Sequence, residues 1–149
     1  MAARINKEIV RLLRDKIDGI SVTVDPSNNR YLICQISGPP DSPYESGIFT
    51  VELYLPPSYP MEAPKCRFVT PIYHMNIDHV GRICLDILKD LWSPAMQINT
   101  VLLSIQSLLQ EPNPNDPLDE KLGTQYLTDK AGYLRKAKQE TQKHATPKC

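Results

Sequence analysis

The stretch IYHMNIDHVGRICLDILKDL, residues 72–91, decides how the rest of the chain is organised. It places a histidine, an asparagine and a cysteine close together in the sequence. Residues with strand-like alternation precede this stretch, and apolar residues at helical spacing follow it. Cys84 comes after Gly81 and Arg82 and opens a short apolar turn. We therefore expect Cys84 to lie on a loop where a sheet passes into helices.

The order of the periodic segments predicts one α+β domain over residues 1–149. An N-terminal helix ends near Gly19, and short turns then join strands in an antiparallel meander. The four expected strands cover residues 22–25, 31–36, 48–55 and 65–70. A helical turn at 85–88 precedes three expected helices, which begin at a cap formed by Asn99 or Thr100, at 119 and at 128. The first of these is apolar almost all round and should be buried, whereas residues 144–149 should form a flexible tail.

Two surfaces have more than one interpretation. One face of the first helix is charged and is either solvated or a docking face for an acidic partner; it carries Arg4, Lys7, Glu8, Arg11, Arg14 and Asp15. In the third strand, alternation assigns Phe49 and its neighbours to the core and Ile48 and Tyr54 to the opposite face. That face is either covered by another element or is a protein-binding patch, with Glu52 and Arg67 as polar anchors.

Charge and cysteine content exclude several classes of function. The 17 basic and 17 acidic side chains give a formal net charge of zero, so no broad field attracts nucleic acid or an anionic membrane. No apolar run has the length of a signal peptide or of a membrane span. The spacing of Cys34, Cys66, Cys84 and Cys149 matches no disulfide framework. We expect free thiols in a reducing compartment, in the cytoplasm and nucleus, without binding to membrane or nucleic acid.

Cys84 differs in its setting from Cys34 and Cys66, which lie on expected strands and suit a core. Backbone N–H groups at the start of a turn, together with Arg82, would favour its thiolate. A thiol is both a good nucleophile and a good leaving group, so acyl transfer is the natural chemistry. The alternative is that Cys84 is one more small core residue.

Three nearby polar residues are candidates to assist Cys84. His74 is either a base for the thiol or, more commonly at a strand end, a structural residue. Asn76 has an amide that could stabilise an oxyanion. Asp116, which follows Asn115 on a proline-rich loop, either forms a turn or receives a proton from an attacking amine. His74, His79 and Cys84 lack the tight spacing of zinc ligands, so we expect no metal.

The runs HMN, GRICLDILKD and WSPAMQINTVLLSIQSLL, with YLICQISGPPDSPYESGIFTVELYLPPSYPMEAPKCRF before them, resemble the ubiquitin-conjugating enzymes. The resemblance extends from about residue 4 to about residue 143. It implies that Cys84 accepts the C-terminus of ubiquitin as a thioester from an activating enzyme, and that a lysine then attacks it. It further implies that Asn76 supports the oxyanion or the active-site loop, that Asp116 orients or deprotonates the lysine, and that His74, Asp86 and Leu118 line the site.

The resemblance is strongest to the family member that builds non-degradative chains through the sixty-third residue of ubiquitin, a lysine. It implies a heterodimer with a catalytically inactive variant, contacted by Glu52, Tyr54 and Arg67, and a role in the DNA damage response. It also implies an interface for the activating enzyme and for a RING-type or U-box ligase, made by Arg4, Lys7, Met61, Ser93, Pro94 and Ala95. No cofactor is expected on the chain itself, because ATP and magnesium act upstream at the activating enzyme.

One residue departs from the family pattern, which is His-Pro-Asn. This chain has His74-Met75-Asn76, and methionine restores a backbone N–H that proline lacks. We expect the motif to function because Asn76 and Cys84 are retained. Three alternatives remain: a conjugating enzyme of broader linkage that needs no variant, a non-catalytic ubiquitin-binding module, and a cysteine hydrolase.

Overall fold

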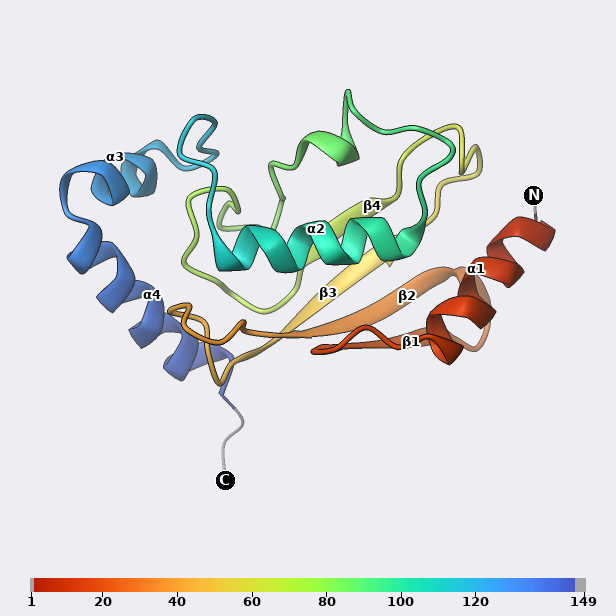
Figure 1. The fold of residues 1–149 in the computed structure, drawn as a ribbon, viewed down its shortest axis with the longest axis horizontal. Helices are drawn as coiled ribbons and strands as arrows, with labels where there is room; N and C mark the ends of the chain where they lie inside the picture. Colours follow the sequence, from red (N-terminus) through yellow and green to blue (C-terminus); the bar gives the residue numbers. More distant parts are fainter. Residues whose placement is uncertain (1, 147–149) are drawn as a thin grey trace.

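Four antiparallel strands form a meander, and one long helix lies across the face of this sheet (Figure 1). The structure is a computed structural model that describes residues 2–146. Helix α1 (Ala2–Arg14) lies at one end of the sheet, and α3 and α4 lie at the other (Figure 1). The remaining elements are β1 (Ile20–Asp25), β2 (Asn28–Ser37), β3 (Ile48–Tyr54), β4 (Lys65–Phe68), a short 3-10 helix (Asp86–Leu88), α2 (Ile98–Gln110), α3 (Glu120–Thr128) and α4 (Lys130–His144). This arrangement confirms the predicted α+β fold and strand order.

The core lies between the sheet and α2. Strand β3 pairs with β2 and β4, and its alternate residues Phe49, Val51 and Leu53 are fully buried. Ile48 and Tyr54 lie on the other face, as the alternation predicted, and both are exposed. The expectation of a wholly buried α2 is wrong in one respect, because Leu103 is 45% exposed on the side that faces away from the sheet.

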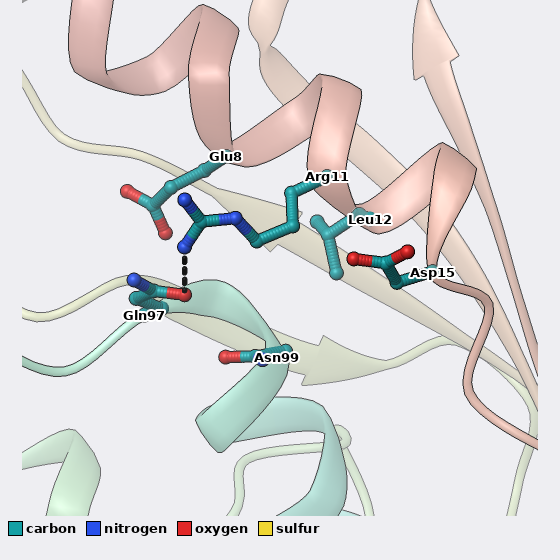
Figure 2. A pocket seen from close by; sticks show the side chains of 6 residues that line it. All are labelled: Glu8, Arg11, Leu12, Asp15, Gln97 and Asn99. Atoms are coloured by element: carbon teal, nitrogen blue, oxygen red, sulfur yellow. Dashed lines mark hydrogen bonds between the residues drawn. The ribbon is translucent and has the colours of Figure 1, made fainter.

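The start of α2 also differs from the prediction. The helix begins at Ile98, and neither Asn99 nor Thr100 caps it. Instead, the Ile98 N–H donates to Glu8 Oε1 over 2.9 Å, so a side chain of α1 satisfies one of the unpaired donors at this helix end. Figure 2 shows this junction of α1 and α2, where Arg11 also donates to Gln97 Oε1 over 3.4 Å.

Glu8 lies in the interior, although the helical pattern assigned it to the charged face of the first helix, away from the core. Its side chain is only 6% exposed, and its carboxylate accepts hydrogen bonds from the Tyr59 hydroxyl at 2.7 and 2.8 Å. Arg4 Nε donates to the same carboxylate over 3.1 Å. Because the charge is paired and fully hydrogen-bonded, it is tolerated in the interior.

Replacing Glu8 with alanine is expected to lower the free energy of unfolding by about 2–4 kcal/mol, because the Tyr59 hydroxyl and the Ile98 N–H lose a buried partner. Chemical denaturation monitored by circular dichroism measures this loss. Glu62→Ala is the matched control, because its carboxylate pairs with Lys65 at an exposed site. There we expect no measurable change, because an exposed ion pair contributes little to stability. Equal losses in the two variants would contradict the structural role of Glu8.

Both ends of the chain show further differences from expectation. Helix α1 ends at Arg14 rather than near Gly19, which instead makes the turn into β1 with a φ of 82°. Residues 144–146 do not form the predicted loose tail. His144 ends α4, and the buried Ala145 accepts a backbone hydrogen bond from Ile48 over 3.0 Å. The rest of the predicted tail, residues 147–149, lies outside the described residues. Within residues 2–146, no helix combines the length and apolarity needed to cross a bilayer.

Candidate active site

Cys84 lies at the junction of sheet and helices, as predicted. β-Bridges join Arg82 to Arg67 of β4 and Ile83 to Ile77, and so hold the segment before Cys84 near the edge of the sheet. The Cys84 N–H donates to the Asn76 carbonyl over 2.8 Å. The 3-10 helix begins two residues later, and its first residue, Asp86, is exposed. Cys84 is partly exposed, so its sulfur is accessible from solvent.

The Cys84 thiol contacts a carboxylate. Its Sγ donates to Asp116 Oδ2 over 3.2 Å, and Asp116 lies on the exposed loop between α2 and α3. Partial burial, and then the hydrogen bond and negative charge of Asp116, raise the pKa of Cys84 above its usual value. The expectation that Arg82 favours the thiolate is wrong, because Arg82 Nε donates to Asp78 Oδ2 over 2.6 Å. Cys84 is thus held as a protonated thiol beside an acceptor for its proton.

Asn76 anchors the loop that carries Asp116. Its side-chain Nδ2 donates to the carbonyls of Asn113 at 2.9 Å and Asp116 at 3.0 Å. Its Oδ1 accepts from the Asn113 N–H over 2.8 Å. Both amide hydrogens are therefore already used, so the predicted donation to an oxyanion does not fit this arrangement. The geometry fits the other predicted role, support of the active-site loop.

His74 is a structural residue in this site. Its ring is fully buried, with Nε2 2.8 Å from the Leu108 carbonyl and Nδ1 accepting from the Asn76 N–H over 3.0 Å. Burial lowers the pKa of His74 to about 4, so the ring is neutral, with its proton on Nε2. Since both nitrogens are engaged, His74 is not available as a base for Cys84. Contrary to the prediction, His74 does not line the site. Its ring lies in the interior and accepts the Asn76 N–H.

The backbone of Met75 connects the same loop to the core. Its carbonyl accepts from the N–H groups of Leu118 at 2.8 Å and Asp119 at 3.0 Å. Its own N–H donates to the Tyr133 hydroxyl over 3.0 Å. The Leu118 side chain is 40% exposed, as a residue at the rim of the site should be. Sequence reasoning missed Tyr133, because nothing in the spacing of α4 distinguishes it from other helix residues that face the core.

The residues assigned to the ligase and the activating enzyme divide into two groups. The exposed side chains are Lys7, Met61, Pro94 and Ala95. Arg4, in contrast, donates from Nη1 to the Pro94 carbonyl at 2.6 Å and from Nη2 to the Met96 carbonyl at 2.7 Å. Trp92 Nε1 donates to the Pro60 carbonyl over 2.8 Å and ties the segment before Ser93 to the turn before Met61. The structure thus brings Arg4 and the loop at Ser93–Ala95 together, with Arg4 largely engaged within the molecule.

The residues assigned to the variant partner lie together on the outer face of the sheet. Glu52 on β3 is opposite Arg67 on β4, and the two side chains form a 3.3 Å ion pair. Tyr54 is 38% exposed, and Ile48 and Val69 are exposed on the same pair of strands or just beyond it. Because Tyr54 is exposed, the interpretation in which another element covers this face does not hold within the described residues. Binding of a protein there stays a prediction.

The other described thiols, Cys34 and Cys66, differ from Cys84 in how their pKa values are shifted. Burial raises the pKa of Cys34 to about 12 and also raises the pKa of Cys66, so neither is a ready nucleophile. Among residues 2–146, no three histidine, cysteine, aspartate or glutamate side chains gather as metal ligands would. Of the thiols that the structure describes, Cys84 is the one placed for chemistry.

The raised pKa of Cys84 predicts the pH dependence of its reactivity. Alkylation by iodoacetamide should increase as the pH rises through and above the ordinary range for a thiol, because the thiolate is the nucleophile. Asp116→Asn removes the negative charge, so the increase should occur at lower pH. Mass spectrometry of the Cys84 peptide measures the rates, and Asp90→Asn, which changes an exposed carboxylate just after the 3-10 helix, is the control. An unchanged profile in Asp116→Asn would contradict the contact.

Comparison with known proteins identifies the family that shares this site. Residues 4–141 match the family described as ubiquitin-conjugating enzyme. Similar proteins include ubiquitin-conjugating enzyme E2 N of Drosophila melanogaster, 53% identical over 95% of this chain and 94% of its own length. Ubiquitin-conjugating enzyme E2 13 of Saccharomyces cerevisiae is 54% identical over 97% and 95%. Ubiquitin-conjugating enzyme E2 N of Macaca fascicularis is 55% identical over 95% and 93%.

Proposed function

Because the chain belongs to the ubiquitin-conjugating enzyme family, we propose that it carries ubiquitin on Cys84 and delivers it to a lysine, and that it builds chains through the sixty-third residue of ubiquitin together with an inactive variant. The observation that carries the proposal is the 3.2 Å contact between Cys84 Sγ and Asp116 on a loop anchored by Asn76. The whole chain, residues 1–149, acts as one catalytic domain. Members of this family generally need no bound cofactor, and ATP and magnesium enter upstream, at the activating enzyme.

Loading is a transthiolation. Cys84 Sγ attacks the C-terminal carbonyl carbon of ubiquitin, which is held as a thioester on a cysteine of the activating enzyme. The new carbon–sulfur bond forms as the old one breaks, and the proton of Cys84 passes to the departing thiolate.

Transfer is an aminolysis of the new thioester. The lysine gives up a proton to Asp116 and its nitrogen attacks the same carbonyl carbon, after which the bond to Cys84 breaks and the thiolate takes up a proton. Asp116 works in this step only if its loop is held at the sulfur. Asn76, with three hydrogen bonds to that loop, is therefore a positioning residue for the acid–base group.

The chain type and the partner depend on the outer face of the sheet. Tyr54 and the Glu52–Arg67 ion pair make an exposed patch, and tyrosine and arginine are two of the residue types that are enriched in protein interfaces. An inactive variant bound there would hold an acceptor ubiquitin with its lysine at the thioester. The ligase and the activating enzyme would meet a different surface, at Lys7, Met61 and the loop at Ser93–Ala95, where Arg4 donates hydrogen bonds to the Pro94 and Met96 carbonyls.

The test reconstitutes chain formation with activating enzyme, ATP, magnesium and ubiquitin, with and without the variant. We expect unanchored chains only with the variant, and none when the sixty-third residue of ubiquitin is arginine. Tyr54→Ala should lose chain formation but keep thioester formation, whereas Leu127→Ala, an exposed apolar residue on α3, should keep both. Equal chain formation without the variant, or chains with the arginine-substituted ubiquitin, would overturn the partner and linkage but not the conjugating activity.

A further inference from the structure

Met75 places a backbone donor in a site where water does not reach. Its side chain is fully buried, and so is that of Tyr133, at 1% exposed. A buried N–H without a partner is costly, and in this chain the partner is the Tyr133 hydroxyl oxygen, 3.0 Å away on α4. Burial raises the pKa of Tyr133, so the hydroxyl stays protonated and neutral near pH 7.

Tyr133 is itself firmly held. Its ring packs against Tyr73, with centroids 5.4 Å apart, and against Tyr126, edge to face, with centroids 5.1 Å apart. Tyr44, a neighbour of this cluster, donates its hydroxyl to the Tyr73 carbonyl over 2.6 Å and stacks on His74. Helix α4 therefore presents the Tyr133 oxygen from a rigid aromatic cluster beside the active-site segment.

The backbone of Met75 is also hydrogen-bonded to the loop that carries Asp116. Its carbonyl accepts from Leu118 and Asp119, which follow Asp116 by two and three residues. The next residue, Asn76, holds the other side of the same loop at Asn113 and Asp116. A shift of the backbone at residue 75 would consequently move both attachments of the segment that brings Asp116 to Cys84.

We propose that Tyr133 is a positioning residue for ubiquitin transfer: by accepting the Met75 N–H, it fixes the backbone of residue 75, whose carbonyl in the following peptide group holds the Asp116 loop. The inference goes beyond the proposed function and rests on it in one respect, that Cys84 forms the thioester. Tyr133 touches neither the sulfur nor the carbonyl under attack. Its effect should therefore appear in lysine discharge, which needs Asp116 in place, more than in loading by the activating enzyme.

The experiment uses a double-mutant cycle on the full chain. Tyr133→Phe keeps the ring and removes the acceptor, and we expect discharge to free lysine to slow about fivefold to tenfold, the effect of one unsatisfied buried group. Met75→Pro removes the donor. The combined variant should therefore recover to within about twofold of the parent, since nothing is left unpaired. Tyr126→Phe, from the same aromatic cluster but without a hydroxyl contact to the loop, is the control.

Three outcomes overturn the inference: unchanged discharge in Tyr133→Phe, a combined variant as slow as Tyr133→Phe, or an equal loss in Tyr126→Phe. Loading of Cys84 is measured first in each variant, so a failure of the proposed function, seen as no thioester in the parent, is distinguished from a failure of this inference. If proline at position 75 prevents folding, hydrogen exchange of the Met75 amide decides. It should be protected in the parent and exchange at least about tenfold faster in Tyr133→Phe, and equal exchange would refute the contact.

Discussion

Cys84→Ala is expected to abolish ubiquitin transfer completely. Without the sulfur no thioester forms, and the buried Cys34 and the half-buried Cys66, whose pKa values are raised by desolvation, cannot substitute for it. The measurement is a single-turnover reaction with activating enzyme, ATP and ubiquitin, resolved on a gel without reducing agent. The adduct of the parent chain should be absent from the variant.

Two matched variants make this prediction sharper. Cys66→Ala should load normally, because Cys66 lies on β4 with its sulfur in the interior. Cys84→Ser should form an ester that survives reducing agent and discharges far more slowly, because an alkoxide is a poorer leaving group than a thiolate. Loading of Cys84→Ala at the rate of the parent would remove the enzymatic role from this residue.

Asn76→Ala is expected to slow discharge to lysine by about 100-fold. The variant loses three hydrogen bonds to the loop, to Asn113 N, Asn113 O and Asp116 O, each contributing about 1 kcal/mol. The loss should fall mainly on discharge, because the sulfur of Cys84 remains and only the placement of Asp116 is relaxed. Single-turnover chase with free lysine at several concentrations measures it.

Asn115→Ala is the control for that loss. Asn115 lies on the same exposed loop, but its side chain makes no hydrogen bond among the contacts of the described residues. We expect its discharge rate within about twofold of the parent, as for surface changes without a specific contact. If Asn76→Ala discharged at the parent rate, the loop anchor would have no part in transfer.

The sequence predicted the features that depend on local periodicity and on strings shared with a family. Alternation in β3 separated Phe49 from Tyr54 correctly, and the junction at Cys84 followed from the change of period. Glu8 was assigned wrongly because helical spacing identifies a face but not what covers it. Its partners, Tyr59 and Ile98, are 51 and 90 residues away along the chain.

The same limit applies within the site. The sequence singled out Asn76, Cys84 and Asp116 as candidates. It did not show that both amide hydrogens of Asn76 bond to the loop, or that Arg82 pairs with Asp78. Methionine at position 75 signalled a change of backbone chemistry, whereas its partner on α4 lies 58 residues further along the chain. Contacts of this kind depend on how the helices pack, which the local sequence pattern does not show.

The most direct test maps the ubiquitin adduct on the unmodified chain. After loading with activating enzyme, ATP and ubiquitin, the adduct is digested without reducing agent and the attachment site is identified by mass spectrometry. We predict a single adduct, joined at Cys84 Sγ, that is cleaved by thiols and consumed when lysine is added. An adduct on another residue, or one at Cys84 that persists in excess lysine, would contradict the account.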